Sequence, residues 1–259
     1  MNNSIEIFLK KYIKLKEVEA IAIGGSKSAK TDDNKSDIDI YIFSTNGISI
    51  IDRKNIIEPI SSKFEIGCEY FGSGDEFFVD SLEQQFDVMY WDINWFESVV
   101  DNTWFKYYPQ NGYTTCFLYT LKNFDIIYDK NNWLHNLQEK INLPYPQKLK
   151  ENIINRNLML MKDKPFASYY EQIEKALLRN DVVSTNHRIS AFIASYFDVI
   201  FAINEQLHPG EKRLIQFAKN NCKILPKDFE ENLISLFKQP NTNTLNLLMK
   251  IFDELKLII

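Results

Sequence analysis

The amino-acid sequence predicts an α/β (α+β) fold in two parts, an α/β half followed by an all-α helical half. Over about the first 140 residues, short apolar β-rich runs alternate with segments of helical periodicity. Pro144 and Pro146 then interrupt the chain, and nearly every later segment has helical spacing. We therefore expect two domains, residues 1–143 and residues 144–259.

The elements of the first half are assigned from their apolar spacing. Helical spacing of apolar residues predicts an amphipathic helix over 4–16, and the apolar run 18–23 predicts a strand that ends at Gly24 and Gly25. Residues 38–43 form a second β-rich run. The further elements expected here are a helix over 53–63, strands over 65–70 and 86–91 with a turn at Gly72 and Gly74 between them, helices over 94–102 and 113–122, and a strand over 124–128.

The second half is expected to fold as a helical bundle, because its apolar residues recur at helical spacing throughout. Neither half contains an internal repeat or a low-complexity segment. The expected helices of the second half span 147–162, 166–179, 185–206, 211–221, 227–238 and 243–257.

The composition excludes several classes of protein. A net charge of −5 and a pI of about 5.4 disfavour a long nucleic-acid partner, which normally requires a basic face. The three cysteines are far apart, which indicates reduced thiols, and no histidine or cysteine spacing predicts a zinc site. No apolar run has membrane-spanning length, and the N-terminus has no secretory pattern, so we expect a cytoplasmic protein.

One segment carries most of the chemical information. Gly24-Gly25-Ser26 directly follows the first strand, where paired glycines let backbone N–H groups approach phosphate oxygens. Asp37 and Asp39 stand two residues apart at the start of the next strand, so their carboxylates face the same side. Two neighbouring carboxylates repel each other unless a cation lies between them, and oxygen ligands suit Mg²⁺. The sequence therefore predicts a phosphate-binding turn beside a magnesium site.

A P-loop is the competing interpretation, because Gly24 to Thr31 nearly matches the pattern Gly-x4-Gly-Lys-Thr. The second glycine is missing, since Ala29 occupies its place. A P-loop also opens a long helix, and only five polar residues separate Thr31 from the next strand. We therefore reject the P-loop, and a dinucleotide-binding Gly-x-Gly-x-x-Gly pattern is absent.

Gly-Gly-Ser followed after a short spacer by Ser-Asp-x-Asp resembles the signature of the polymerase-β-like nucleotidyltransferase superfamily. The resemblance covers roughly residues 18–92 and is strongest to small bacterial aminoglycoside- and lincosamide-type nucleotidyltransferases with a helical C-terminal domain. It implies a catalytic domain with a mixed sheet flanked by helices, followed by a helical domain that binds the acceptor. It also implies two divalent metal ions, Mg²⁺ or Mn²⁺, held by Asp37, Asp39 and a third carboxylate from a neighbouring strand.

The resemblance assigns roles to particular residues. Asp87, within Gln85-Phe86-Asp87-Val88, is the best match to the third carboxylate, and Asp75, Glu76 and Asp92 are the alternatives. The catalytic and metal-binding residues are thus expected to be Asp37, Asp39 and Asp87. The residues expected to bind the triphosphate are Gly24, Gly25, Ser26, Lys27, Lys30, Ser36 and Lys212. The chain departs from the family at Ala29 and Lys30, where many members have a basic residue and then a glycine.

The resemblance implies transfer of a nucleoside monophosphate, AMP from ATP by default, to a hydroxyl group of an antibiotic-like small molecule, with release of pyrophosphate. Two alternatives stay open. The chain can be a nucleotide-binding regulatory member of the fold that does not turn over, or an enzyme with a protein acceptor; a tRNA acceptor is disfavoured by the acidic pI. Further candidates for the cleft, each with a purely structural alternative, are Arg179, Asp181, Arg213, His187 and the aromatic residues Tyr169, Tyr170, Tyr196 and Phe197.

Overall fold

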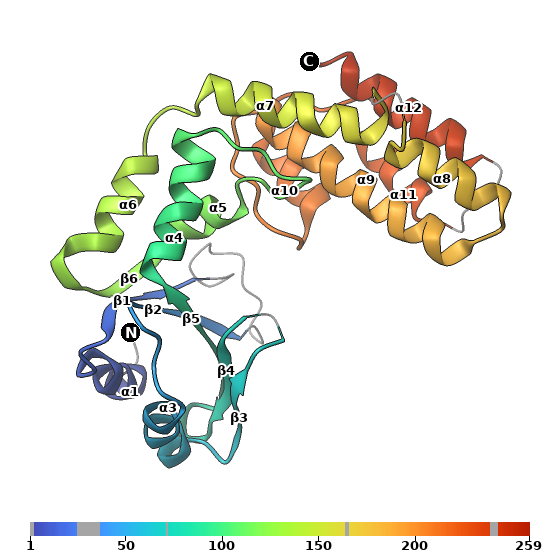
Figure 1. Ribbon diagram of the computed structural model, residues 1–259. Coiled ribbons are helices and arrows are strands. Elements are labelled where there is room, and N and C mark those ends of the chain that lie inside the picture. Colours follow the sequence, from blue (N-terminus) through green and yellow to red (C-terminus); the bar gives the residue numbers. More distant parts are fainter. Residues whose placement is uncertain (1–2, 25–36, 71, 164–165, 239–242) are drawn as a thin grey trace. The chain divides into compact units, whose positions relative to one another are not determined.

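The computed structural model describes residues 3–24, 37–70, 72–163, 166–238 and 243–259, with side chains from Phe8 onward (Figure 1). The chain divides into two compact units. Unit 1 comprises Met1–Asp101 and Thr120–Leu143, and unit 2 comprises Asn102–Tyr119 and Pro144–Ile259.

Unit 1 is built on a six-stranded mixed sheet with strand order β3-β4-β5-β2-β1-β6. Its central pair, β2 and β5, is parallel, and every other neighbouring pair is antiparallel. The strands span Val18–Ile23 (β1), Ile38–Ser44 (β2), Lys63–Cys68 (β3), Gly74–Val79 (β4), Gln84–Asp92 (β5) and Asp125–Asp129 (β6). A mixed sheet with flanking helices, followed by a helical C-terminal region, confirms the fold class that the sequence predicts.

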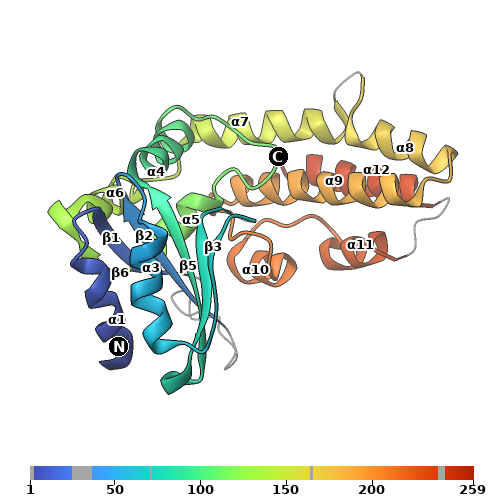
Figure 2. The ribbon, with the colours of Figure 1, turned by 60° about the horizontal axis from the view of Figure 1, so that its bottom comes forward.

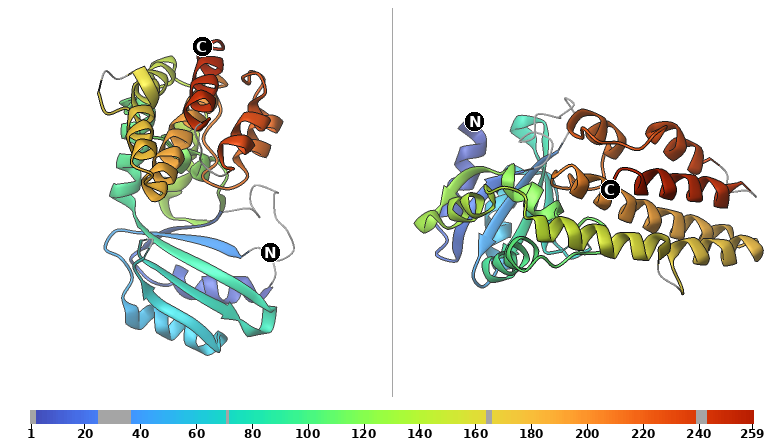
Figure 3. Two further views of the ribbon diagram at one scale, coloured as in Figure 1. Left: turned by 90° about the vertical axis from the view of Figure 1, so that its right-hand side faces the viewer. Right: turned by 90° about the horizontal axis from the view of Figure 1, so that it is seen from above.

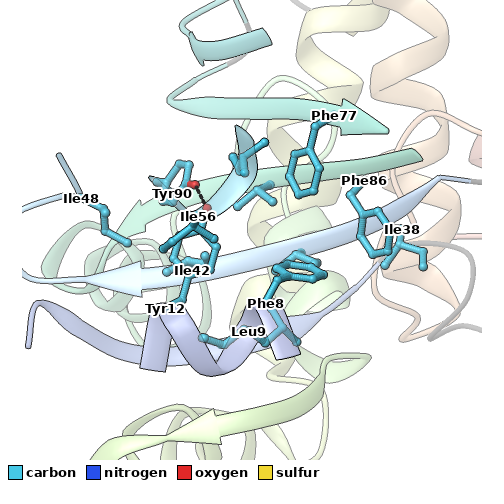
Figure 4. Packing of buried hydrophobic residues seen from close by; sticks show 14 of the residues in the cluster. Phe8, Leu9, Tyr12, Ile38, Ile42, Ile48, Ile56, Phe77, Phe86 and Tyr90 are labelled. Atoms are coloured by element: carbon cyan, nitrogen blue, oxygen red, sulfur yellow. Dashed lines mark hydrogen bonds between the residues drawn. The ribbon is translucent and has the colours of Figure 1, made fainter. Parts of the chain in front are cut away.

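One face of the sheet packs against α1 (Asn3–Ile13) and α3 (Ile50–Ile57), which lie side by side (Figure 2). Their apolar residues join those of the strands in a single cluster. Phe8 of α1 meets Phe77 and Phe86 edge-on, with ring centroids 6.0 and 5.5 Å apart (Figure 4). The Tyr12 and Tyr90 hydroxyl groups are hydrogen-bonded at 2.7 Å, so α1 is also tied to β5 by a buried polar contact.

Part of the opposite face of the sheet is covered by an aromatic cluster. Phe43 and Trp91 lie near the C-terminal ends of β2 and β5. Both side chains point to this face, because alternate side chains of a strand point to opposite faces of the sheet. They pack against residues of α4 (Ile93–Val100), α6 (Trp133–Ile141) and the residue preceding β6. The covering residues are Phe96, Phe124 and Trp133. Asp37, Asp39 and Asp87 belong to the same face but lie at the other end of these strands.

Unit 2 is helical and is organised around α9 (Val182–Ile203), whose C-terminal half is buried (Figure 3). Because α9 presents apolar residues on all sides from Phe192 onward, it must be surrounded by other elements. It packs along α7 (Gln147–Leu158) and α8 (Tyr169–Leu178). The remaining helices are α10 (Leu214–Asn221), α11 (Phe229–Leu236) and α12 (Thr244–Lys256), and α5 (Cys116–Lys122) spans the boundary between the two units.

The sequence analysis missed two elements of unit 1. Residues 72–74 were expected to be a turn, but β4 begins at Gly74. The strand is hard to recognise because it carries Asp75 on its buried face, where that carboxylate pairs with Arg53 at 3.2 Å. Helix α6 was also missed, because it is short and begins directly after Asn131 and Asn132, which both have positive φ.

Residues 102–119 also group differently from the expected division of the chain. They fall within the range expected for the first domain, yet they belong to unit 2. Buried polar contacts explain this: Thr114 Oγ1 donates to Asp198 Oδ2 at 2.6 Å, and the Gly112 N–H donates to Asn157 Oδ1 at 3.1 Å. Sequence periodicity does not report such side-chain contacts between distant segments.

Within the described residues, no helix has the length and apolarity needed to cross a membrane.

Candidate active site

The expected catalytic aspartates come together at one position in the sheet. Asp39 of β2 lies directly opposite Asp87 of β5 in the parallel pairing. Asp37 is two residues before Asp39 and is exposed, so it faces the same side of the sheet. Three carboxylates predicted from sequence to act together therefore lie on one face of two neighbouring strands.

The pairing extends this row of carboxylates by two strands. Glu76 of β4 is the register partner of Asp87, and Glu65 of β3 is the register partner of Glu76. Neighbouring strands are about 4.8 Å apart, so the charges on one face act on each other. The pKa of Glu76 is accordingly raised, first by partial burial and then by Asp87, Glu65 and Asp37.

The structure separates the four candidates for the third carboxylate. Asp75 is turned to the opposite face, where it is buried and accepts hydrogen bonds from Tyr90 and from the Gly67 N–H. Asp92 is the N-cap of α4 and accepts from the Trp95 N–H at 2.9 Å. Both carboxylates already have structural partners. Glu76 and Asp87 are the two candidates on the face of Asp39, and of these Asp87 is the direct neighbour of Asp39.

The chemistry of these side chains fits a hard divalent cation. Carboxylate oxygens are the ligands that Mg²⁺ prefers, and closely opposed carboxylates repel each other until a cation neutralises them. In the described part of the chain, no three His, Cys, Asp or Glu side chains are grouped closely enough to hold a metal ion as they stand. The backbone register sets Asp39 opposite Asp87, and Asp37 stands two residues before Asp39.

Gly24 is the only expected phosphate-binding residue of the glycine turn that the structure describes. Its N–H donates to the carbonyl oxygen of Asp39 at 2.9 Å, so it continues the pairing of β1 with β2. A Cβ at Gly24 would lie 2.5 Å from Cε2 of Tyr41, which no side chain can accommodate without displacement of the ring. The other expected residues of this turn and spacer, Gly25, Ser26, Lys27, Lys30 and Ser36, lie outside the described residues.

The candidates in unit 2 fall mostly into structural roles. Tyr196 and Phe197 are buried in the helical core, where both rings pack against Phe229. Asp181 is the N-cap of α9, and its pKa is lowered first by the hydrogen bond that it accepts from the Ser184 N–H.

The remaining candidates of unit 2 are only partly buried or exposed. Lys212 is exposed, and the adjacent Arg213 is the N-cap residue of α10 with a φ of 55°. Arg179 and His187 are also exposed, whereas Tyr169 and Tyr170 are half-buried. Burial therefore does not exclude these residues from ligand binding.

The sequence analysis missed a buried polar cluster in unit 2. Asp198 is 2% exposed and accepts hydrogen bonds from the Thr114 N–H and Oγ1 and from Asn157 Nδ2. His208 is fully buried, and its backbone N–H donates to Thr115 Oγ1 at 2.8 Å. An aspartate within the apolar sequence of α9 was the available signal, because a buried carboxylate requires partners from another segment.

Comparison with known proteins gives limited matches. A family model described as "Domain of unknown function (DUF4037)" matches residues 113–214, which lie mainly in unit 2. No curated protein matches the chain.

Three of the solved structures that resemble the chain are described by their identity, coverage and TM-score. A nucleotidyltransferase-like protein from Exiguobacterium sibiricum 255-15 has 8% identity and a TM-score of 0.48, and the match covers 98% of this chain and 72% of that one. Spectinomycin adenyltransferase AAD(9) from Enterococcus faecialis, solved with ATP and spectinomycin, has 14% identity and a TM-score of 0.32 over 98% and 97% of the two chains. The CdnE c-di-GMP synthase from Capnocytophaga granulosa has 16% identity and a TM-score of 0.28 over 98% and 79%.

Because the identities and TM-scores are low, the function of this chain has to be argued from its own residues.

Proposed function

We propose that the chain is a metal-dependent nucleotidyltransferase that transfers a nucleoside monophosphate, AMP from ATP by default, to a hydroxyl group of a small molecule. The observation that carries this proposal is the register of Asp39 with Asp87, with Asp37 on the same face. Gly24, the first residue of the glycine turn, is hydrogen-bonded to the backbone of Asp39 itself. A phosphate-binding turn and a carboxylate site on adjacent strands are what a metal-bound nucleoside triphosphate requires.

In this proposal Asp37, Asp39 and Asp87 hold two divalent ions. When bound, the ions supply the positive charge that offsets the triphosphate and lowers the pKa of the acceptor hydroxyl. Asp87 would lie beside the acceptor oxygen and help to take its proton. The backbone at Gly24 holds the start of the glycine turn beside β2, and the helical unit 2 is assigned the acceptor. The attacking hydroxyl oxygen forms a bond to the α-phosphorus as the bond to pyrophosphate breaks.

Thermal stability with nucleotides tests this proposal directly. The protein is heated with ATP, GTP, CTP or UTP, each with and without Mg²⁺, and compared with Asp39→Asn. A ligand that binds only the folded state stabilises it by about 2.7 kcal/mol at a hundred times its dissociation constant. We expect a Mg²⁺-dependent increase in Tm for one nucleotide, reduced in Asp39→Asn. Glu17→Gln, a carboxylate change just before β1, at the other end of the sheet, is the matched control and should respond as the wild type does.

A second candidate function is nucleotide binding without turnover, as in a regulatory protein. The observation that favours it is the departure of Ala29 and Lys30 from the family pattern. Release of pyrophosphate from the preferred nucleotide, measured with a panel of hydroxyl acceptors, separates the two functions. Binding with no turnover across a broad acceptor panel would favour the regulatory function, and absence of binding by any nucleotide at millimolar concentration would contradict both.

A further inference from the structure

The contact between Gly24 and Tyr41 links the aromatic core of unit 1 to the start of the glycine turn. Tyr41 is two residues after Asp39 in β2, so its ring is on the face of the carboxylates. The ring is 91% buried and packs against Trp91 and Phe124, with centroids 4.7 and 4.8 Å away. Its edge is turned to Gly24, whose missing side chain leaves the space that the ring occupies.

Two observations show why position 24 requires glycine. A Cβ there would meet Cε2 and Cδ2 of Tyr41 at 2.5 and 3.1 Å and Cε1 of Phe124 at 3.3 Å. Gly24 is not among the residues with positive φ, so its backbone conformation is one that other residues also adopt. The requirement is therefore steric: the aromatic ring lies against the backbone, and the ring is itself fixed by the packed core.

The backbone of Gly24 is held from a second side by Asp39. The Gly24 N–H donates to the Asp39 carbonyl at 2.9 Å, so the first residue of the turn lies between a strand hydrogen bond and the Tyr41 ring. Tyr41 keeps its proton, because burial and then the Asp39 carboxylate raise its pKa. On this face of β2, the neutral Tyr41 ring thus lies between the Asp39 carboxylate and the Phe43 ring.

We propose that Tyr41 is a positioning residue for nucleotide binding: packed against Gly24, its ring sets where the glycine turn leaves β1 relative to Asp39. The inference rests on the proposed function, since it assigns this contact to the same site. Tyr41 touches neither nucleotide nor metal in this role. It acts through Gly24, because a displacement of about one ångström in a positioning element can cost much of its contribution to a site.

A double-mutant cycle tests the inference. Tyr41→Leu removes the ring edge that holds Gly24, and Gly24→Ala drives a methyl group into the ring. Each single change is expected to weaken Mg²⁺-dependent nucleotide binding by about tenfold, as expected when a binding element is displaced. The double variant Gly24→Ala/Tyr41→Leu should bind more tightly than the product of the single effects predicts, because leucine leaves room for the methyl group. Tyr41→Phe keeps the ring and should bind as the wild type does.

Loss of packing alone is separated by a matched control. Phe96 is fully buried in the same aromatic cluster, against Phe43, Trp91 and Phe124, but is not among the nearest neighbours of Gly24. Phe96→Leu should lower Tm while leaving nucleotide affinity unchanged. If Gly24→Ala does not fold, the nucleotide affinities of Tyr41→Leu, Tyr41→Phe and Phe96→Leu still test whether Tyr41 is a positioning residue.

The outcomes are distinct for the two proposals. Any of three results would overturn the positioning role while leaving the proposed function intact. They are wild-type affinity in Tyr41→Leu, strictly additive single effects, and an equal loss of affinity in Phe96→Leu. A wild-type protein that binds no nucleotide would instead overturn the proposed function on which this inference rests.

Discussion

At the scale of single residues, the two carboxylates opposite each other on β4 and β5 have different surroundings. Asp87 faces Asp39 directly and accepts a hydrogen bond from Gln85 Nε2 at 3.2 Å. Glu76 is one strand further from Asp39 and is exposed. In the proposed site Asp87 is therefore a metal ligand, and Glu76 contributes only negative charge from a neighbouring strand.

This difference predicts unequal effects on catalysis. Asp87→Asn should lower the rate of Mg²⁺-dependent pyrophosphate release by at least about a hundredfold, because it removes both a ligand and the proposed proton acceptor. Glu76→Gln should change the rate by only a few-fold, since it removes one screened surface charge. Both rates are measured at saturating nucleotide. A larger loss in Glu76→Gln than in Asp87→Asn would make Glu76 the third carboxylate.

At the scale of elements, one buried network holds the sheet edge in register. The Asp75 carboxylate of β4 binds Arg53 of α3, the Tyr90 hydroxyl of β5 and the Gly67 N–H of β3. Arg53 also donates to the Ile48 carbonyl and lies over the Tyr90 ring, 4.1 Å from its centroid. Because Asp75 and Glu76 are adjacent, the network that fixes Asp75 on one face also fixes Glu76 beside Asp87 on the other.

Removal of one member should destabilise unit 1 strongly. Asp75→Ala leaves the Arg53 guanidinium buried without its carboxylate, which typically costs about 3–5 kcal/mol. The free energy of unfolding is measured in urea, with Lys219→Gln as the control. Lys219 pairs with Glu230 at 2.6 Å, but both side chains are more than 40% exposed, so its loss should cost less than about 1 kcal/mol. Equal losses in the two variants would show that the network does not stabilise the sheet.

The same network explains which elements could be predicted from the sequence. β1, β2, β5 and the helices of the second half follow apolar periodicity, and their predicted bounds lie within a few residues of the observed ones. β4 could not be predicted, because Asp75 is acceptable inside a strand only when Arg53 and Tyr90 arrive from elsewhere in the chain. Short-range patterns do not contain that information.

The candidate site likewise contains residues that the sequence predicts and contacts that it does not. Asp37, Asp39, Gly24 and the choice of Asp87 came from a local motif and its resemblance to a family, and the strand pairing brings the three aspartates together. The contact of Tyr41 with Gly24 depends on the register of β1 with β2, so no motif reveals it. Lys212 lies in unit 2, and its part in triphosphate binding stays a prediction.

At the scale of the whole molecule, two buried titratable groups stand close to the chain segment that joins the units. The Asp198 carboxylate accepts from Thr114, whereas His208 contacts Thr115 through its backbone N–H and the Tyr113 ring through its imidazole, with ring centroids 4.7 Å apart. Burial raises the pKa of Asp198 to about 6 despite its three hydrogen-bond donors, and burial lowers the pKa of His208 to about 3. The Gly210 N–H donates to His208 Nδ1 at 3.1 Å, which places the imidazole proton on Nε2.

The two shifts act on stability in opposite directions. Between pH 3.8, the ordinary pKa of an aspartate, and about 6, folded Asp198 holds more proton than the unfolded chain, so its contribution to stability falls as pH rises. Between about pH 3 and 6.5, the ordinary pKa of a histidine, folded His208 holds less proton than the unfolded chain, so its contribution to stability rises with pH. The windows overlap from about pH 4 to 6, where the two slopes cancel.

Replacing one of the two groups should therefore reveal how the other makes the free energy of unfolding depend on pH. In His208→Asn, whose side-chain oxygen replaces Nδ1 as acceptor for Gly210, stability relative to the wild type should fall as pH rises from 4 to 6. In Asp198→Asn, relative stability should rise over the same range. Each slope is at most about 1.4 kcal/mol per pH unit, the limit for one proton, and urea unfolding at pH 4, 5, 6 and 7 measures it.

Tyr113, Tyr145 and Cys116, which also sense Asp198, have raised pKa values and do not titrate in this range. A relative stability that does not change with pH in one variant would mean that the group it removes titrates in the folded protein as it does in the unfolded chain.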